Sequence, residues 1–210
     1  MPSIKGMIRE WEAKLGDRVL GISTLGTRRG DYPEQESEHG DSFWYESKSY
    51  YLNWLYLRPL RLGRQDVVYD IGCGAGRLLI VAALCGVARC VGLELSQRLC
   101  ELASENAANL RIPHAPLKIE QADACTRDYA DGDVFLFCNP FGPATLEVVL
   151  EKIRQSLQTR PRVIRIMYIH PEPGHRELFA RLDWMELKLE RTFPGARGIP
   201  AMYFEMRSPG

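Results

Sequence analysis

From residue 66 onward, the sequence alternates short apolar runs with segments of helical periodicity. The apolar runs are rich in β-branched and aromatic residues, which predicts strands at 66–71, 89–94, 116–121, 133–139 and 162–170. The segments between them predict helices at 76–84, 96–110 and 143–158. Strands that alternate with helices form a parallel sheet with right-handed crossovers and helices on both faces. The alternation therefore predicts a doubly wound α/β fold.

The C-terminal segment departs from this alternation. After a short helix at 174–182, two further strands are expected at 184–190 and 200–206, with only a short connection between them. Such neighbours pair most simply as an antiparallel couple at the end of the sheet. The expected architecture is a mostly parallel seven-stranded sheet with an antiparallel C-terminal strand.

The first 65 residues have a different texture. Four apolar residues at helical spacing predict a first helix whose apolar stripe packs on the main body: Ile4, Ile8, Trp11 and Leu15. A polar stretch at 24–42, rich in glycine and charge, predicts a loop or lid. A second helix is expected at 47–57 and ends at Pro59. The chain therefore divides into a helical N-terminal extension or lid at 1–65, packed on the core, and an α/β core at 66–210.

Composition restricts the class of protein. The 210 residues suffice for one sizeable core, and 27 basic residues balance 27 acidic ones, which argues against a nucleic-acid-binding protein. The longest apolar run, at 78–88, is too short to span a membrane, and the first residues lack the apolar core of a signal peptide. The six cysteines form no CxxC or Cys/His cluster, so we expect reduced thiols, no metal site and a cytoplasmic location.

A glycine-rich turn, VVYDIGCGAGR, follows the first expected strand of the core. Gly72, Gly74 and Gly76 let the backbone turn tightly and let a ligand approach the free N–H groups at the start of the next helix. A dinucleotide site requires GxGxxG, whereas this turn has GxGxG. Asp70 places a negative charge beside it, which disfavours a pyrophosphate and favours an ammonium or a sulfonium.

Two acidic residues follow the next strands. Glu94 lies about 20 residues after the glycines, where a carboxylate can accept hydrogen bonds from both hydroxyls of a ribose. Asp123, after the third strand, can accept one from an exocyclic amine such as that of adenine. The glycine turn and these two carboxylates together predict a nucleoside ligand with a cationic tail, as in S-adenosylmethionine.

From residue 66 to the C-terminus, the sequence resembles the class I S-adenosylmethionine-dependent methyltransferases, which have a seven-stranded Rossmann-like sheet. VVYDIGCGAGR resembles their first motif, GLELS their ribose motif, QADA their adenine motif and FCNPFG their fourth motif. The resemblance implies that the chain is an enzyme with S-adenosylmethionine as cofactor. By the same resemblance, the methionine part, the ribose and the base are held by Asp70, Gly72, Gly74, Gly76, Glu94, Leu95, Asp123, Ala124 and Asn139.

The segment SFWYESKSYYLNWL resembles the region before the sheet in one branch of this family, which includes small bacterial methyltransferases and the histone-lysine type. In that branch an aromatic, hydroxyl-bearing stretch closes over the methionine end. The resemblance implies that Tyr45, Ser47 and Tyr50 contact the cofactor, and it keeps a protein lysine methyltransferase as an alternative.

The catalytic candidates follow the fourth and fifth strands. Asn139, in NPFG, occupies the place where relatives bind a planar amine, but Phe141 and Gly142 stand where a second proline and an aromatic residue are usual. His170 ends the fifth strand and is the candidate base. Further candidates for a proton acceptor are His175, Tyr168, Glu172 and His39.

The expected function is methyl transfer from S-adenosylmethionine to an N or O nucleophile of a small molecule or a protein side chain, without nucleic acid or membrane as partner. A non-catalytic S-adenosylmethionine-binding regulatory subunit is the alternative from another class; it needs no ordered acceptor site. An NAD-linked dehydrogenase is a third possibility, against which the glycine spacing argues. The sequence does not indicate the acceptor or the oligomeric state.

Overall fold

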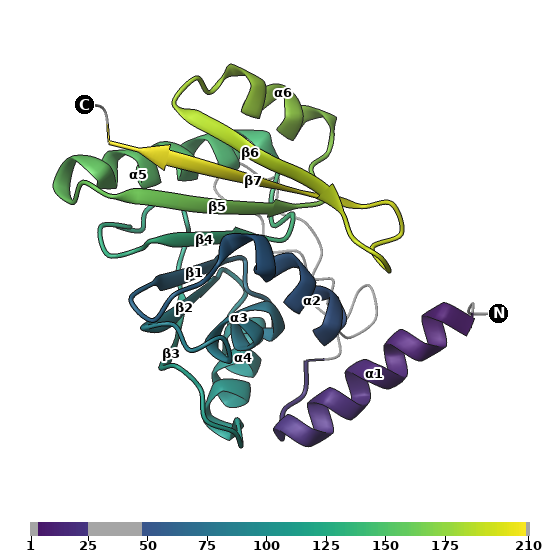
Figure 1. Cartoon of the computed structure of the whole chain (residues 1–210). Coiled ribbons are helices and arrows are strands. Elements are labelled where there is room, and N and C mark those ends of the chain that lie inside the picture. The colour runs from purple at the N-terminus through teal and green to yellow at the C-terminus, as the bar shows by residue number, and fades with distance from the viewer. Residues whose placement is uncertain (1–3, 25–47, 209–210) are drawn as a thin grey trace.

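The computed structural model describes residues 4–24 and 48–208, with side chains from residue 11 onward. Its centre is one seven-stranded sheet with the order β3-β2-β1-β4-β5-β7-β6 (Figure 1). The first five strands along the chain pair in parallel, and β7 runs antiparallel to both of its neighbours, β5 and β6. The strands are β1 (Val67–Ile71), β2 (Arg89–Glu94), β3 (Leu117–Gln121), β4 (Val134–Phe137), β5 (Val163–Ile169), β6 (Met185–Thr192) and β7 (Pro200–Arg207).

The helices confirm the alternation expected from the sequence. After the N-terminal helices, each crossover between parallel strands carries one helix, except that from β3 to β4. Ser96 caps α4 as expected, since its hydroxyl accepts a hydrogen bond from the Leu99 N–H. The helices are α1 (Ile4–Leu20), α2 (Tyr50–Leu57), α3 (Arg77–Ala83), α4 (Gln97–Asn109), α5 (Pro143–Thr159) and α6 (Pro173–Arg181), with a 3-10 turn, η1 (Arg58–Leu60), after α2. The predicted α/β fold is therefore confirmed, including the antiparallel pair at the end of the sheet.

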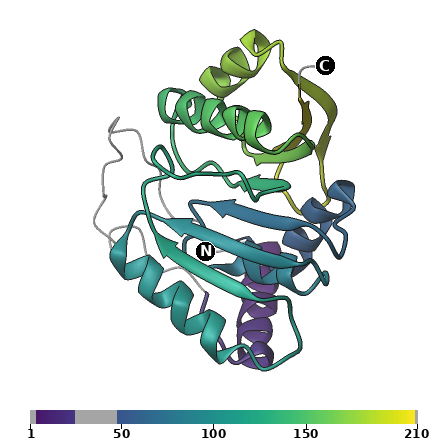
Figure 2. The same ribbon diagram turned by 90° about the vertical axis from the view of Figure 1, so that its left-hand side faces the viewer.

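The sheet separates two layers of helices (Figure 2). Helices α5 and α6 cover one face, where they pack on Tyr69 and Ile71 of β1. Helices α2 and α3 cover the other face, where they pack on Val68 of the same strand. Successive side chains of a strand point to opposite faces. Asp70 therefore lies on the α3 face, and this register decides what surrounds its carboxyl group.

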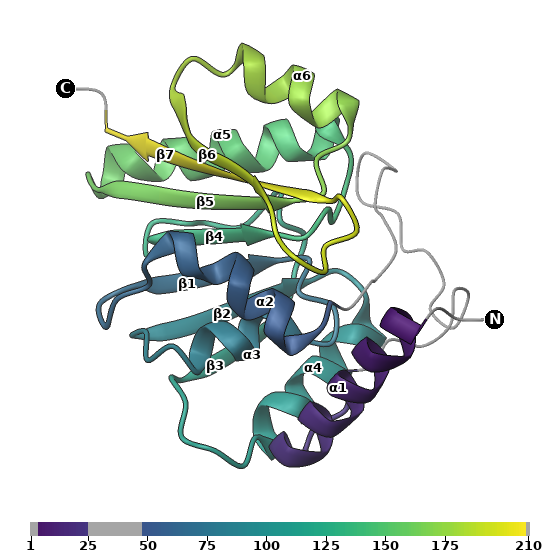
Figure 3. The same cartoon turned by 45° about the vertical axis from the view of Figure 1, so that its right-hand side comes forward.

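The glycine turn between β1 and α3 lies at the carboxyl edge of the parallel strands. The loops after β2, β3, β4 and β5 reach the same edge, because all five strands run in the same direction. Helix α2 and the β6–β7 connection meet beside this edge (Figure 3). There the rings of Tyr56 and Phe193 lie edge to face, 5.3 Å apart, and the Tyr203 hydroxyl donates to the Tyr56 carbonyl.

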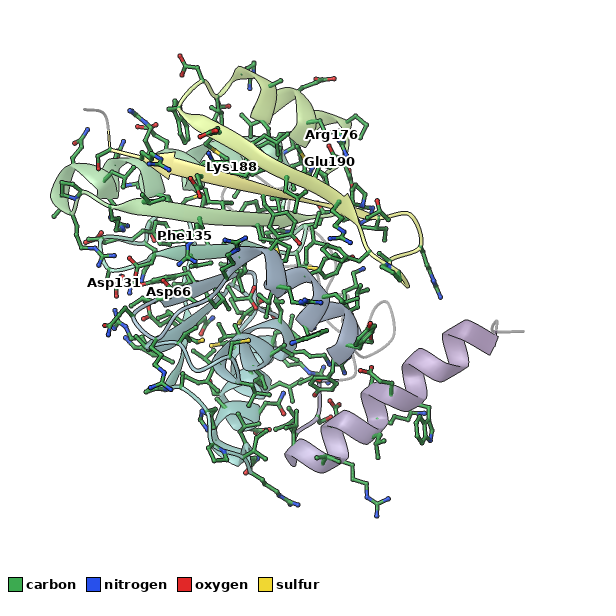
Figure 4. All side chains as sticks on the ribbon, viewed as in Figure 1. Asp66, Asp131, Phe135, Arg176, Lys188 and Glu190 are labelled. Carbon is green, nitrogen blue, oxygen red and sulfur yellow. The ribbon has the colours of Figure 1, made fainter. Side chains whose placement is uncertain are left out.

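The opposite edge of the sheet is held by ion pairs. Asp66 and Asp131 lie at this amino edge of the strands, while Arg176 and Glu190 lie toward the other end of the molecule (Figure 4). Arg165 contacts Asp66 at 2.5 Å, and Arg89 pairs with Asp131. The carboxylates of this edge are thus neutralised by arginines within the fold.

The predicted packing of the first helix is wrong. Helix α1 forms, but Trp11 is 65% exposed and Leu15 is 45% exposed. The face of α1 toward the body carries Ala13, Asp17 and Leu20 instead, which are buried. This small and polar face packs more closely than Trp11 would allow, so the apolar stripe points away from the body. The side chains of Ile4 and Ile8 lie outside the described residues.

All six cysteines are free thiols, and four of them are buried. Within residues 4–24 and 48–208, no helix has the length and apolar character needed to cross a membrane.

Candidate active site

The glycine turn is fixed by its own backbone and by the loop after β4. The N–H groups of Gly72 and Cys73 both donate to the Leu93 carbonyl at 2.9 Å. Gly72 has a φ of +73°, and a Cβ at this position would lie 2.5 Å from Cβ of Pro140. A side chain at Gly72 is therefore excluded by backbone conformation and by space. This close approach places the turn after β4 directly against the glycine turn.

Asp70 lies beneath the glycine turn and is 2% exposed. The backbone N–H of Leu79, in the first turn of α3, donates to its carboxyl group. Its Oδ2 is buried and has no hydrogen-bond partner among the described residues. Burial, together with the nearby charge of Glu94, raises the pKa of Asp70 to about 7. An unpartnered carboxylate oxygen fits a cationic ligand, such as the methionine end of S-adenosylmethionine.

Glu94 ends β2 with its carboxylate held by two loops. Its Oε2 accepts from the Gly74 N–H at 2.8 Å, and its Oε1 accepts from the Ser96 N–H at 2.9 Å. Burial raises its pKa, and these backbone donors lower it in part. Each carboxylate oxygen can accept a second hydrogen bond. Glu94 is therefore oriented by the glycine turn and keeps acceptor capacity for the two hydroxyls of a ribose.

Asp123 follows β3 and forms a local turn. Its Oδ1 accepts from the Cys125 N–H at 2.8 Å, and its carbonyl accepts from the Thr126 N–H at 3.1 Å. The next residue, Ala124, is buried, and its carbonyl accepts from the hydroxyl of Tyr129 at 2.7 Å. The turn holds the carboxyl group at the same edge as Glu94, where it suits an exocyclic amine.

The carboxylates of this edge differ from those of the opposite edge. Within the described part of the chain, none of Asp70, Glu94 and Asp123 forms an ion pair with a lysine or an arginine. Negative charge without an internal partner destabilises a fold unless a ligand compensates it. A ligand with positive charge and hydrogen-bond donors would therefore compensate the negative charge of the carboxyl edge.

Asn139 follows β4 with both ends of its amide bonded to the protein. Its Nδ2 donates to Oε1 of Glu172 at 3.3 Å, and its Oδ1 accepts from the Tyr168 hydroxyl at 3.1 Å. Because a carboxylate only accepts, the amide nitrogen must face Glu172, which fixes this orientation. Asn139 also has a φ of +49°, a strained conformation that is typical of functional sites.

The two histidines after β5 have different environments. His170 is half-buried and has a φ of +66°. Its backbone N–H donates to the Pro200 carbonyl at 3.0 Å. His175 is 1% exposed, and both ring nitrogens are engaged. Its Nδ1 accepts from the Glu172 N–H, so its Nε2 carries the proton and donates to the Phe141 carbonyl at 2.9 Å. His175 thus caps α6 and supports the loop after β4, a structural role that leaves His170 as the histidine candidate.

A buried polar cluster next to the site is not predicted by the sequence. Arg77, the first residue of α3, is 3% exposed, and its Nε donates to Oγ1 of Thr24 at 2.6 Å. Its Nη1 donates to the Lys48 carbonyl at 2.8 Å, its Nη2 lies 3.5 Å from Oδ1 of Asp17, and its guanidinium stacks on the ring of Tyr50. No local pattern indicates this cluster, because the ion pair joins residues 60 positions apart.

Tyr50, a predicted cofactor contact, belongs to this cluster. Its hydroxyl donates to Oδ1 of Asp17 at 2.5 Å, and burial and that carboxylate raise its pKa. Tyr50 therefore supports the glycine turn through Arg77, and its contact with cofactor stays a prediction. Tyr45, Ser47 and His39 lie outside the described residues.

The structure thus brings most of the predicted site residues to one edge. Asp70, Gly72, Gly74, Gly76, Glu94, Leu95, Asp123, Ala124, Asn139 and His170 all lie at the end of a parallel strand or in the loop after it. Their roles toward a ligand stay predictions. The described residues contain no group of three or more His, Cys, Asp or Glu side chains arranged to hold a metal ion.

Comparison with known proteins identifies the same region. A family model described as "Methyltransferase domain" matches residues 68–160. An uncharacterized protein of Methanocaldococcus jannaschii is 40% identical over 47 residues, which are 22% of this chain and 22% of that protein. The match thus spans only about a fifth of this curated relative.

Solved structures share the fold at low sequence identity. An RNA methyltransferase from Salinibacter ruber, solved in complex with S-adenosyl-L-homocysteine, is 21% identical, with a TM-score of 0.57 over 79% of this chain and 96% of that chain. A SAM-dependent methyltransferase from Methanosarcina mazei is 12% identical, with a TM-score of 0.57 over 72% of this chain and 96% of that chain.

Proposed function

We propose that this chain, whose residues 68–160 match the methyltransferase-domain family model, is a class I enzyme that uses S-adenosylmethionine as cofactor and methylates an N or O nucleophile of a small molecule or a protein side chain. The observation that carries the proposal is the carboxyl edge itself. The glycine turn, Asp70, Glu94 and Asp123 meet there, and within residues 4–24 and 48–208 these carboxylates form no ion pair with a lysine or an arginine; Asn139 and His170 follow the neighbouring strands.

The cofactor, when bound, supplies an activated methyl group on a sulfonium, which needs no further activation. Asp70 would offer to the cationic end of the cofactor its Oδ2, which has no hydrogen-bond partner among the described residues. Glu94, held by the Gly74 N–H, orients the ribose, and Asp123 with Ala124 receives the base. The protein then has to hold the nucleophile in line with the methyl group at ~3 to 3.5 Å and to accept its proton. Asn139 and His170, which follow β4 and β5, would position the acceptor.

The acceptor class is inferred from charge and size. The 210-residue chain has a formal net charge of zero, without the basic excess that RNA binding requires. The similar Salinibacter ruber protein is an RNA methyltransferase by its title, so RNA is the competing acceptor. We further place the protein in the cytoplasm, on the strength of its six free cysteines.

Methyl transfer is tested with S-adenosylmethionine carrying a labelled methyl group. The purified protein is incubated separately with a panel of small amines and alcohols, with an unfractionated protein extract, and with total RNA, and the label in each product is localised by mass spectrometry. We expect label in the small-molecule or protein reaction. Label only in RNA would overturn the acceptor assignment, and no transfer with any acceptor would contradict the enzyme activity.

The variant Asn139→Ala distinguishes the enzyme from the alternative of a non-catalytic binding subunit. We expect this variant to bind S-adenosylhomocysteine like the wild type but to lose most of its turnover, because Asn139 lies on the acceptor side of the glycine turn. A variant with full turnover would remove Asn139 from the reaction.

A further inference from the structure

We propose that Glu172 is the carboxylate that receives the acceptor, and that the acceptor is an amine that binds with positive charge. This inference rests on the proposed function and narrows it to one substrate class. It assigns to Glu172 the role of a proton acceptor in direct contact with the nucleophile.

Glu172 is connected to the glycine turn by a short series of contacts. Gly72 approaches Pro140 so closely that no Cβ fits between them. Asn139 precedes Pro140, and its amide nitrogen donates to Oε1 of Glu172. Glu172 therefore lies on the β4–β5 side of the glycine turn, on the side away from Glu94 and Asp123.

The carboxyl group of Glu172 is oriented by the protein while it stays exposed. As the N-cap of α6, its side chain accepts from the His175 backbone N–H. Asn139 holds Oε1 at 3.3 Å. These two donors leave further acceptor positions on the carboxylate toward solvent. A group that is fixed by two donors and still open to solvent is suited to bind a substrate.

The charge of Glu172 has no basic partner in the part of the chain that the structure describes. Arg176, one turn further along α6, pairs with Glu190 of β6 at 2.5 Å, and Figure 4 labels the two residues side by side. A cationic acceptor would supply the missing partner. An anionic acceptor such as a phosphate would be repelled by Glu172 and by the carboxylates along the same edge.

The amide of Asn139 is already bonded to the protein at both ends, so that its oxygen keeps one acceptor position. Its Oδ1, the atom that would accept from an amine, already accepts from the Tyr168 hydroxyl. Phe141 is buried, with its ring 6.3 Å from that of Phe137, so it does not offer a face on which a planar base could stack. Gly142 follows it. This arrangement disfavours a nucleobase amine and favours an aliphatic one.

In the proposed reaction, proton transfer to Glu172 precedes methyl transfer. The bound ammonium transfers a proton to the carboxylate of Glu172, which becomes a neutral acid. The freed lone pair on nitrogen forms the new nitrogen–carbon bond while the bond between methyl and sulfur breaks, and its electron pair stays on sulfur. The products are a methylated ammonium and S-adenosylhomocysteine, and Glu172 releases its proton to solvent.

The inference is tested by binding alone, with S-adenosylhomocysteine and sinefungin as probes. In sinefungin an amine-bearing carbon replaces the sulfur, so an ammonium stands where the transferable methyl group would be. We expect Glu172→Gln to weaken the binding of sinefungin at least about threefold, because a lost charge pair at short range has an effect of this order even in a water-like dielectric. The affinity for S-adenosylhomocysteine should stay unchanged. Gln keeps an oxygen for the α6 cap, and Glu172→Asp, which keeps the charge, should restore sinefungin binding in part.

Glu177→Gln is the matched control, because it removes the same charge from an exposed position of the same helix. It should change neither affinity. Unchanged sinefungin binding in Glu172→Gln, or an equal loss for both probes, would overturn the role of Glu172 and leave the proposed function intact. Failure of S-adenosylhomocysteine to bind the wild type would overturn the proposed function and this inference together.

Discussion

The acidic residues of the carboxyl edge differ in their burial and in the groups that hold their carboxylates. Asp70 is buried with one oxygen unpartnered, whereas Glu94 is held by backbone donors from the glycine turn and from α4. Glu172 is exposed and held by Asn139. Burial, backbone donation and a side-chain amide thus hold three carboxylates at one edge, and we assign them in the proposal to a cation, a ribose and an acceptor.

Asp70 makes cofactor binding depend on pH. Burial and the charge of Glu94 raise its pKa to about 7, and only the ionised form attracts the cationic end of the cofactor. The affinity for S-adenosylmethionine should therefore rise between pH 6 and 8 and fall by up to about tenfold per unit below the raised pKa. Calorimetry across this range tests the effect. Asp70→Asn should bind weakly at every pH, and a flat profile for the wild type would contradict this role.

The same shift should lower the stability of the unbound protein as pH rises. The folded pKa of Asp70, about 7, lies above the ordinary value of 3.8, so the folded state binds more protons than the unfolded state between these values. The stability is fully present below pH 3.8 and is lost as pH rises through 7. Asp70→Asn should thus be more stable than the wild type at pH 8 in urea unfolding. An equal or lower stability would show that the ionised carboxylate is compensated within the fold.

At the scale of elements, the glycine turn connects β1, α3 and the loop after β4. Three of its residues have positive φ: Gly72, Gly74 and Gly76. Gly76 caps α3, and Gly72 makes room for Pro140. The close approach of Gly72 to Pro140 therefore decides how far Asn139, the residue before Pro140, lies from the glycine turn.

Substitution of Gly72 should cost more than backbone strain alone. Gly72 and Gly86 have nearly the same φ, +73° and +75°, but only at Gly72 does a Cβ meet another atom within 4 Å. Gly86→Ala should therefore cost about 1–2 kcal/mol, and Gly72→Ala a further 1–3 kcal/mol or so from the contact with Pro140. Urea unfolding compares them. Equal losses in the free energy of unfolding would mean that the loop after β4 moves away from the new side chain at no cost. In that case Gly72→Ala should not weaken the binding of S-adenosylhomocysteine either.

Much of the fold and of the site could be predicted from the sequence, and the exceptions have physical reasons. Strand ends could be predicted because they coincide with the ends of apolar runs, and parallel pairing brings them to one edge. The face that α1 turns toward the body could not be predicted. Periodicity shows that Trp11 and Leu15 belong to an apolar stripe, but it does not show whether this stripe faces the body or solvent. The bond between Asn139 and Glu172 joins two loops 33 residues apart, and no local pattern indicates it.

At the scale of the whole molecule, Arg77 joins the N-terminal extension to the core. Its guanidinium contacts Asp17 of α1, Thr24 and the Lys48 carbonyl, and it stacks on Tyr50 of α2. Because Arg77 begins α3, the extension is anchored directly behind the glycine turn. Arg77 therefore connects the extension to the start of α3, and Asn106 connects it to the glycine turn, since its Nδ2 donates to the carbonyls of Ser23 and Ala75.

Removal of this guanidinium should destabilise the protein strongly. Arg77→Met removes the guanidinium that pairs with the buried Asp17, which should lower the free energy of unfolding by about 3–5 kcal/mol. Arg89→Met is the control: it breaks a half-exposed pair with Asp131 and should cost no more than about 1 kcal/mol. Asp17→Asn in the Arg77→Met background should recover part of the loss. Equal costs for both arginines would show that the extension is held by other contacts.

The most direct test of the account is a calorimetric titration with S-adenosylhomocysteine and with NAD. We predict that the wild type binds S-adenosylhomocysteine and not NAD, that Glu94→Ala loses at least about tenfold in affinity because two ribose hydroxyls lose a charged acceptor, and that the exposed helix variant Glu105→Ala binds like the wild type. Binding of NAD, or equal S-adenosylhomocysteine affinities for the wild type and Glu94→Ala, would contradict the assignment of this edge as the methyl-donor site.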